Sequence, residues 1–176
     1  DSWEDFFALA DEGKKITMLD ELRETIGVAL ILNGHSVNTD DDAALAEAEE
    51  TLLELRPKIS AFSYDVVSLV QSGDVAAAHW YVGATLYAMQ EPAKLGFAIP
   101  EEGATMYQED MCILKSAPNK ENAVRFMEFY LQPEIAALNV EQQVNGTPNV
   151  PARDLLSPEL KRSEEHTSEL QSHAPI

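Results

Sequence analysis

The sequence has one cysteine, Cys112, and twelve lysine and arginine side chains against thirty-one aspartates and glutamates. A single cysteine excludes a disulfide bond within the chain. The formal net charge of -19 repels nucleic-acid phosphates and favours cationic partners. No apolar run approaches the roughly 20 residues that a membrane-spanning helix needs. The composition therefore argues against a nucleic-acid partner.

Familiar catalytic and metal-binding motifs are missing as well. The chain contains no Gly-x-Ser-x-Gly elbow, no Walker loop, no Gly-x-Gly-x-x-Gly and no His-Glu-x-x-His. His35 and His79 lack ligand spacing, and we expect His79, in an apolar segment, to be a packed residue, because a zinc site needs three or four convergent ligands. Cys112 is expected to be a small buried hydrophobe. The sequence predicts neither an enzyme nor a bound metal or cofactor.

Helical and extended patterns alternate along the chain. Helices are expected at 2–7, 20–33, 43–56, 65–71 and 84–90, and strands at 14–19, 58–63, 75–82, 95–100 and 110–114. Asp20 is expected to cap the second helix, with Leu22, Ile26, Ala29 and Leu30 on its inner face. This alternation predicts a parallel or mixed sheet covered on its faces by helices.

The last residues do not continue this pattern. Residues 162–173 read Arg-Ser-Glu-Glu-His-Thr-Ser-Glu-Leu-Gln-Ser-His and resemble a sequencing adapter translated in frame. We expect 162–176 to be a non-native tail, disordered or a stray helix, with no part in the fold. Because the chain begins with Asp1, we also expect it to be a fragment of a longer protein.

The run from Pro118 to Pro151 is the most informative stretch. Asn119 is a good N-cap. The apolar residues that follow share one helical face, namely Ala123, Phe126, Met127, Tyr130 and Leu131. Pro133 ends that helix and suits the start of the next, and Thr-Pro-Asn follows at 147–149. This arrangement resembles the C-terminal part of the extracellular solute-binding proteins of ABC importers, in particular their spermidine/putrescine-binding branch.

The resemblance implies a fold and a division of the chain. The expected fold is α/β, a periplasmic-binding-protein-like (type II) lobe whose mixed sheet is flanked by helices, with a stub of the partner lobe. Residues 1–105 would form the second lobe, 106–144 the returning segment of the first lobe, and 145–161 the C-terminal crossover back to the second lobe.

Glu21 and Glu24 form an acidic pair three residues apart, so both project from the first turn of one helix. Acids in a first turn commonly do no more than complement the helix dipole. The resemblance implies more, since the spermidine/putrescine branch has an acidic pair in an Asp-x-Arg-Glu context that grips a ligand amine. This chain reads Glu21-Leu-Arg-Glu24, which keeps the spacing but lengthens the first acid.

Three further residues are candidates for contact with a ligand. Trp80 is either a core residue or, as the resemblance implies, a wall of the ligand slot, and strand alternation would place His79 and Tyr81 on the opposite face. Asp110 and Gln108 are either polar loop residues or, by resemblance, the far end of the slot. The family has an aromatic where this chain has Gln108, and another where it has Asn145, which makes the expected slot more polar.

The resemblance implies capture of a cationic polyamine in an interlobe cleft, for uptake through an ABC permease of the inner membrane. The expected location is periplasmic or extracellular, with or without a lipid anchor, and a signal peptide would lie upstream of this sequence. Three alternatives stay open. They are a binding protein of the same fold for an amino-acid-like or opine-like solute, an enzyme on a similar two-lobed scaffold, and an interaction protein built on the acidic surface.

Overall fold

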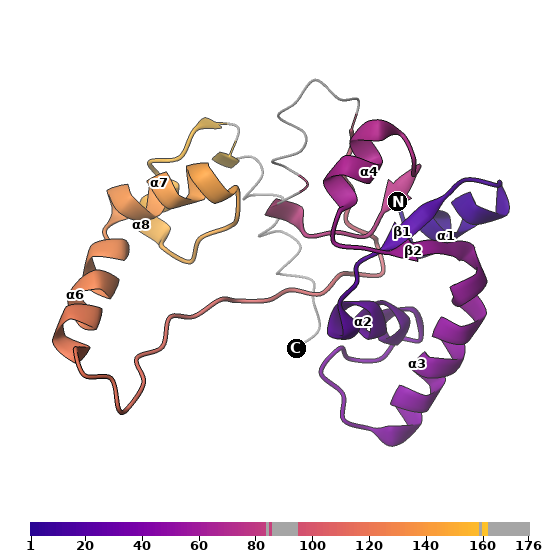
Figure 1. The fold of residues 1–176 in the computed structure, drawn as a ribbon, viewed down its shortest axis with the longest axis horizontal. Coiled ribbons are helices and arrows are strands. Elements are labelled where there is room, and N and C mark those ends of the chain that lie inside the picture. Colours follow the sequence, from indigo (N-terminus) through magenta and orange to yellow (C-terminus); the bar gives the residue numbers. More distant parts are fainter. Residues whose placement is uncertain (84, 86–94, 159, 162–176) are drawn as a thin grey trace. The chain divides into compact units, whose positions relative to one another are not determined.

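The computed structural model describes residues 1–83, 85, 95–158 and 160–161 (Figure 1). Most of the helix expected at 84–90, and the tail at 162–176, lie outside these residues. The described chain forms two compact units that divide between Met106 and Tyr107. The expected lobes, at 1–105, 106–144 and 145–161, remain a prediction.

Unit 1 is built on three short parallel strands. They are β1 (Ile16–Met18), β2 (Ile59–Phe62) and β3 (Ala77–Ala78), arranged in the order β2-β1-β3. Ile16 lies opposite Ile59 on one side and Ala77 on the other. All three residues of the central strand are buried, as a strand of a parallel sheet covered on both faces must be. The predicted α/β class is confirmed.

Helices surround this sheet, and several of their ends carry residues that commonly cap helices. They are α1 (Trp3–Asp11), α2 (Leu22–Leu32), α3 (Asp42–Leu55), the short 3₁₀ helix η1 (Arg56–Lys58) and α4 (Val66–Ser72). Ser2 caps α1 by accepting the amide of Asp5 at 2.9 Å, and Asp41 caps α3 by accepting that of Ala43 at 2.7 Å. Gly73 ends α4 in the left-handed region, with φ of 78°.

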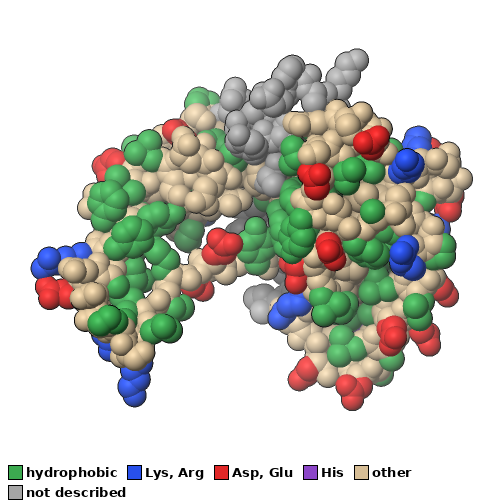
Figure 2. Space-filling view, viewed as in Figure 1, with side chains coloured by type: hydrophobic (Ala, Val, Ile, Leu, Met, Phe, Trp, Pro, Cys, Tyr) green, Lys and Arg blue, Asp and Glu red, His purple; other side chains and the backbone are tan. Residues whose placement is uncertain are grey.

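Two apolar clusters hold unit 1 together. The first joins α1, α2 and the sheet, and consists of Trp3, Phe7, Ile16, Met18, Val28 and Ile59. The second packs α2 on α3 through Ala29, Leu30, Ala44 and Ala48, whose small alanines let the two helices approach closely. The surface of this unit carries scattered acidic side chains (Figure 2), consistent with the strongly negative charge.

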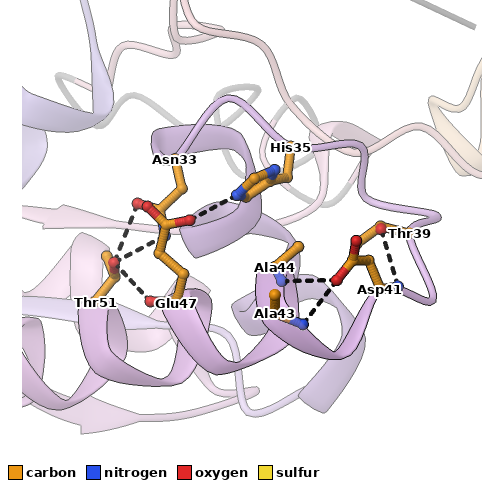
Figure 3. A network of polar contacts seen from close by, with 8 residues as sticks. All are labelled: Asn33, His35, Thr39, Asp41, Ala43, Ala44, Glu47 and Thr51. Atoms are coloured by element: carbon orange, nitrogen blue, oxygen red, sulfur yellow. Dashed lines mark hydrogen bonds and ion pairs between the residues drawn. The ribbon is translucent and has the colours of Figure 1, made fainter.

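Polar contacts fasten the end of α2 to α3 (Figure 3). Nε2 of His35 lies 2.8 Å from Oε2 of Glu47. The amide of Asn33 donates to the hydroxyl of Thr51 at 3.0 Å, and that hydroxyl lies 3.1 Å from the Glu47 carbonyl. His35 therefore contributes to the polar contacts that join the end of α2 to α3.

Unit 2 contains α6 (Lys120–Tyr130), α7 (Pro133–Gln143) and α8 (Val150–Arg153). Its core is Ala136, Ala137, Val140, Ala152 and Leu156. Asn149 caps α8 by accepting the amide of Ala152 at 3.2 Å, and its own amide donates to the Leu131 carbonyl at 2.7 Å. The Thr-Pro-Asn motif thus links α8 to the end of α6.

Several sequence expectations fail in unit 1. Glu21, not Asp20, caps α2, and Leu22 is 75% exposed because the helix begins there and its inner face starts a turn later. The strand expected over 75–82 is limited to Ala77–Ala78, and residues 95–100 form no strand. An apolar run forms a strand only where a neighbouring strand continues to pair with it.

Unit 2 departs from expectation in the same way. Residues 110–114 form no strand, and Cys112 is exposed rather than buried. On α6, Ala123, Met127 and Tyr130 are half-buried, whereas Phe126 and Leu131, the residue that follows the helix, are exposed. Hydrophobic side chains are visible along this helix (Figure 2). Among the described residues of this unit no sheet covers that face.

Candidate ligand-binding site

Glu21 and Glu24 lie at the start of α2, directly after the central strand β1 and the two residues that follow it. Oε2 of Glu21 accepts the Glu24 amide at 2.7 Å, so Glu21 caps the helix. Both side chains are half-buried. The end of a parallel strand and the first turn of the next helix meet at the edge where ligands of open α/β folds bind.

Glu24 does not complete a capping box with Glu21. Its Oε2 instead accepts a hydrogen bond from the hydroxyl of Thr105, a residue eighty-one positions later in the chain. The first turn of α2 therefore carries one carboxylate used in capping and a second that is held by a distant segment of the same unit.

Trp80 lies two residues beyond β3, the strand beside β1. It is half-buried, and its ring lies 5.7 Å from that of Tyr64 in an edge-to-face arrangement and 5.8 Å from that of Tyr81. The expectation that Tyr81 lies opposite Trp80 is wrong, because regular alternation holds only within a strand and β3 ends at Ala78. His79 is packed as expected, edge-to-face on Trp3 at 5.2 Å.

The electrostatics of Tyr81 tie the aromatic cluster to the acidic pair. Burial raises the pKa of the Tyr81 hydroxyl to about 12, with further contributions from Tyr64, with which it shares a hydrogen bond, and from the negative charges of Glu24 and Glu21. Its phenol therefore stays neutral and polar near two carboxylates. Trp80, Tyr81 and Tyr64 and the two glutamates belong to one neighbourhood of unit 1.

This neighbourhood has the chemistry of a cation site. Carboxylates pair with ammonium groups, and aromatic faces attract cations and pack against methylene chains, each such contact being worth roughly 0.5–2 kcal/mol. Trp80 adds an indole Nε1 that is buried without a hydrogen-bond partner among the described residues. Nothing in the cluster resembles a nucleophile activated by a base.

Gln108 and Asp110 lie in unit 2, in a segment without helix or strand. Both are exposed, and the Gln108 amide donates to Oδ1 of Asp110 at 3.0 Å. The two side chains contact each other. Their role at the far end of a ligand slot remains a prediction.

Sequence reasoning missed Tyr64, the contact of Tyr81 with the cluster, and Thr105. Tyr64 follows β2 after a single residue, so its position at a strand end was a usable signal. Thr105 offered none, because it approaches α2 only through the fold. Across the described parts of the chain, no group of three histidine, cysteine or acidic side chains is arranged to hold a metal ion, and no helix there has the length and apolarity to cross a bilayer.

The fold is that of an α/β protein with a parallel sheet, and the cluster of acidic and aromatic residues is its candidate binding site. The family model described as "Bacterial extracellular solute-binding protein" matches residues 1–167. The spermidine/putrescine-binding periplasmic protein of Salmonella typhimurium is 32% identical over 160 residues, which cover 90% of this chain and 46% of the relative. The putrescine/cadaverine-binding protein of Pseudomonas aeruginosa is 32% identical over 155 residues, covering 84% of this chain and 44% of the relative.

A solved structure agrees. The spermidine/putrescine ABC transporter substrate-binding protein of Streptococcus pneumoniae superposes with a TM-score of 0.78 at 31% identity, covering 91% of this chain and 50% of that one. The chain belongs to the bacterial extracellular solute-binding protein family, as the sequence motifs predicted, and spans about half the length of the relatives it matches. The Salmonella relative is named as a binding protein, and the Streptococcus structure as the substrate-binding protein of an ABC transporter.

Proposed function

We propose that the protein captures a polyamine such as spermidine or putrescine in a cleft between two lobes and passes it to an ABC permease of the inner membrane. The observation that carries this proposal is the acidic pair Glu21 and Glu24 beside the aromatic cluster of Trp80. The names of the matched relatives support the same ligand class. A periplasmic or extracellular location follows from this role.

In this mechanism Glu24 pairs with one ammonium group and the Trp80 ring lies against the adjacent methylenes. By resemblance to the family, Asp110 pairs with the second ammonium group. Paired charges matter because a buried unpaired charge is costly. A ligand that contacts both lobes favours the closed state over the open one, and the permease recognises the closed state.

Substitution of the two acids tests the proposal in the full-length protein. We expect Glu24→Gln and Asp110→Asn each to weaken spermidine binding roughly tenfold or more, because each loses a charge-assisted hydrogen bond. Isothermal titration calorimetry measures the effect. Wild-type affinity in both variants would remove these residues from the site.

A second candidate is a binding protein for an amino-acid-like or opine-like solute. The buried Trp80 N–H, which has no acceptor among the described residues, and the polar Gln108 and Asn145 favour a ligand that carries hydrogen-bond acceptors. A thermal-shift panel separates the two, since a ligand that binds only the folded state raises its melting temperature. Stabilisation by polyamines supports the first function, and stabilisation by an anionic solute alone supports the second.

A further inference from the structure

Thr105 lies along the face of α2 that carries the candidate ligand carboxylate. Its hydroxyl donates to Oε2 of Glu24. Its methyl carbon Cγ2 lies only 2.9 Å from the place where a Cβ on Gly27 would stand. Glu24 and Gly27 are three residues apart and therefore neighbours on one helical face. The absence of a side chain at Gly27 is what lets Thr105 approach Glu24.

The segment that carries Thr105 is fastened without any help from Glu24. Both carboxylate oxygens of Glu102 lie 3.1 Å from the Trp3 amide, and the Trp3 indole N–H donates to the Gly103 carbonyl at 2.9 Å. The Glu101 amide donates to the Asp1 carbonyl at 3.0 Å. Trp3 itself is part of the main core of unit 1. Thr105 is thus held by α1, and it holds Glu24 in turn.

A glutamate side chain loses rotamer freedom when it pairs with a ligand, and this loss weakens binding. A carboxylate whose Oε2 is already hydrogen-bonded has lost that freedom before the ligand arrives. No hydrogen bond from the described residues reaches Oε1 of Glu24, which leaves that oxygen for an ammonium group. The contact therefore suits preorganisation of an anion for a cationic ligand.

We propose that Thr105 is a positioning residue of the ligand site, which sets the orientation of the Glu24 carboxylate in advance of polyamine binding. This inference rests on the proposed function. It gives the 101–105 segment an indirect role in ligand affinity, because none of its residues is proposed to contact the ligand.

The test is a titration of the full-length protein with spermidine. Thr105→Val keeps the methyl group against Gly27 but removes the donor, and we expect it to weaken binding roughly fivefold to tenfold. Thr105→Ser keeps the donor and should restore affinity to within about twofold of wild type. In Gly27→Ala, the added methyl group meets Cγ2 of Thr105 and displaces Thr105 from Glu24. This variant should weaken spermidine binding while α2 remains intact.

Two controls separate positioning from general destabilisation. Thr25→Val removes a hydroxyl that donates to the Leu19 carbonyl at 2.9 Å, one residue from Glu24, and should leave spermidine affinity unchanged. In the Glu24→Gln background, Thr105→Val should cost little more, because the two residues act through one carboxylate.

The outcomes are distinct. Wild-type affinity in Thr105→Val, or equal losses in Thr105→Val and Thr25→Val, would overturn the positioning role while the proposed function stands. Full additivity of Thr105→Val with Glu24→Gln would overturn it as well. Absence of spermidine binding by the wild-type protein would refute the proposed function and this inference with it.

Discussion

His79 makes the stability of unit 1 depend on pH. Its ring packs edge-to-face on Trp3, and its Nδ1 is buried without a hydrogen-bond partner among the described residues. Burial lowers the pKa of His79 from 6.5 to about 4, because the charged ring would lose its hydration. The folded protein therefore keeps this histidine neutral at pH values where the unfolded chain protonates it.

The sign and size of the effect follow from linkage. Where the unfolded state binds more protons than the folded state, stability rises with pH. The contribution of His79 to the free energy of unfolding is thus fully present above pH 6.5, and it falls as the pH drops toward 4. The loss amounts to about 2 kcal/mol at pH 5 and approaches about 3 kcal/mol near pH 4, at about 1.36 kcal/mol per pKa unit.

The assay is urea unfolding of the full-length protein at pH 7.5 and pH 5, followed by fluorescence. His79→Phe keeps a ring against Trp3 and removes the titrating group, so its loss between the two pH values should be smaller than that of wild type by about 2 kcal/mol. His35→Gln keeps His79 and should retain the wild-type loss. Equal losses in wild type and His79→Phe would show that His79 titrates normally and refute the reasoning.

Two further predictions concern the stability of the two units. Asn149→Ala should destabilise unit 2 by about 1–2 kcal/mol, because it removes the cap of α8 and the bond to the Leu131 carbonyl; hydrogen exchange of the α8 amides that stays at wild-type rates would contradict it. Ile16→Ala should cost about 2–5 kcal/mol, because Ile16 is fully buried in the central strand; a loss below about 1 kcal/mol in chemical denaturation would show that the cavity collapses.

The elements that sequence predicted best are those whose signals are local. The helices expected at 43–56 and 65–71 and the helix start at Pro133 all depend on a few neighbouring residues, and all are present. The central strand was predictable because its apolar residues are flanked by helical patterns on both sides.

Features that depend on distant neighbours were not predictable. The segment at 110–114 is apolar enough for a strand, yet it forms none, because pairing requires a partner strand. Cys112 is exposed for the same reason. Thr105 meets Glu24 across eighty-one residues, and only the folded chain brings them together. The acidic pair and Trp80 could be named as candidates because the resemblance to the family points to them, and their role in binding stays a prediction.

The decisive experiment on the proposed polyamine site is a crystal structure of the full-length protein with spermidine. We expect an ammonium nitrogen within hydrogen-bonding distance of the Glu24 carboxylate, methylenes of the ligand against the Trp80 ring, and the second charged end near Asp110. Spermidine bound elsewhere, with Glu24 facing solvent and Trp80 out of contact with the ligand, would contradict it.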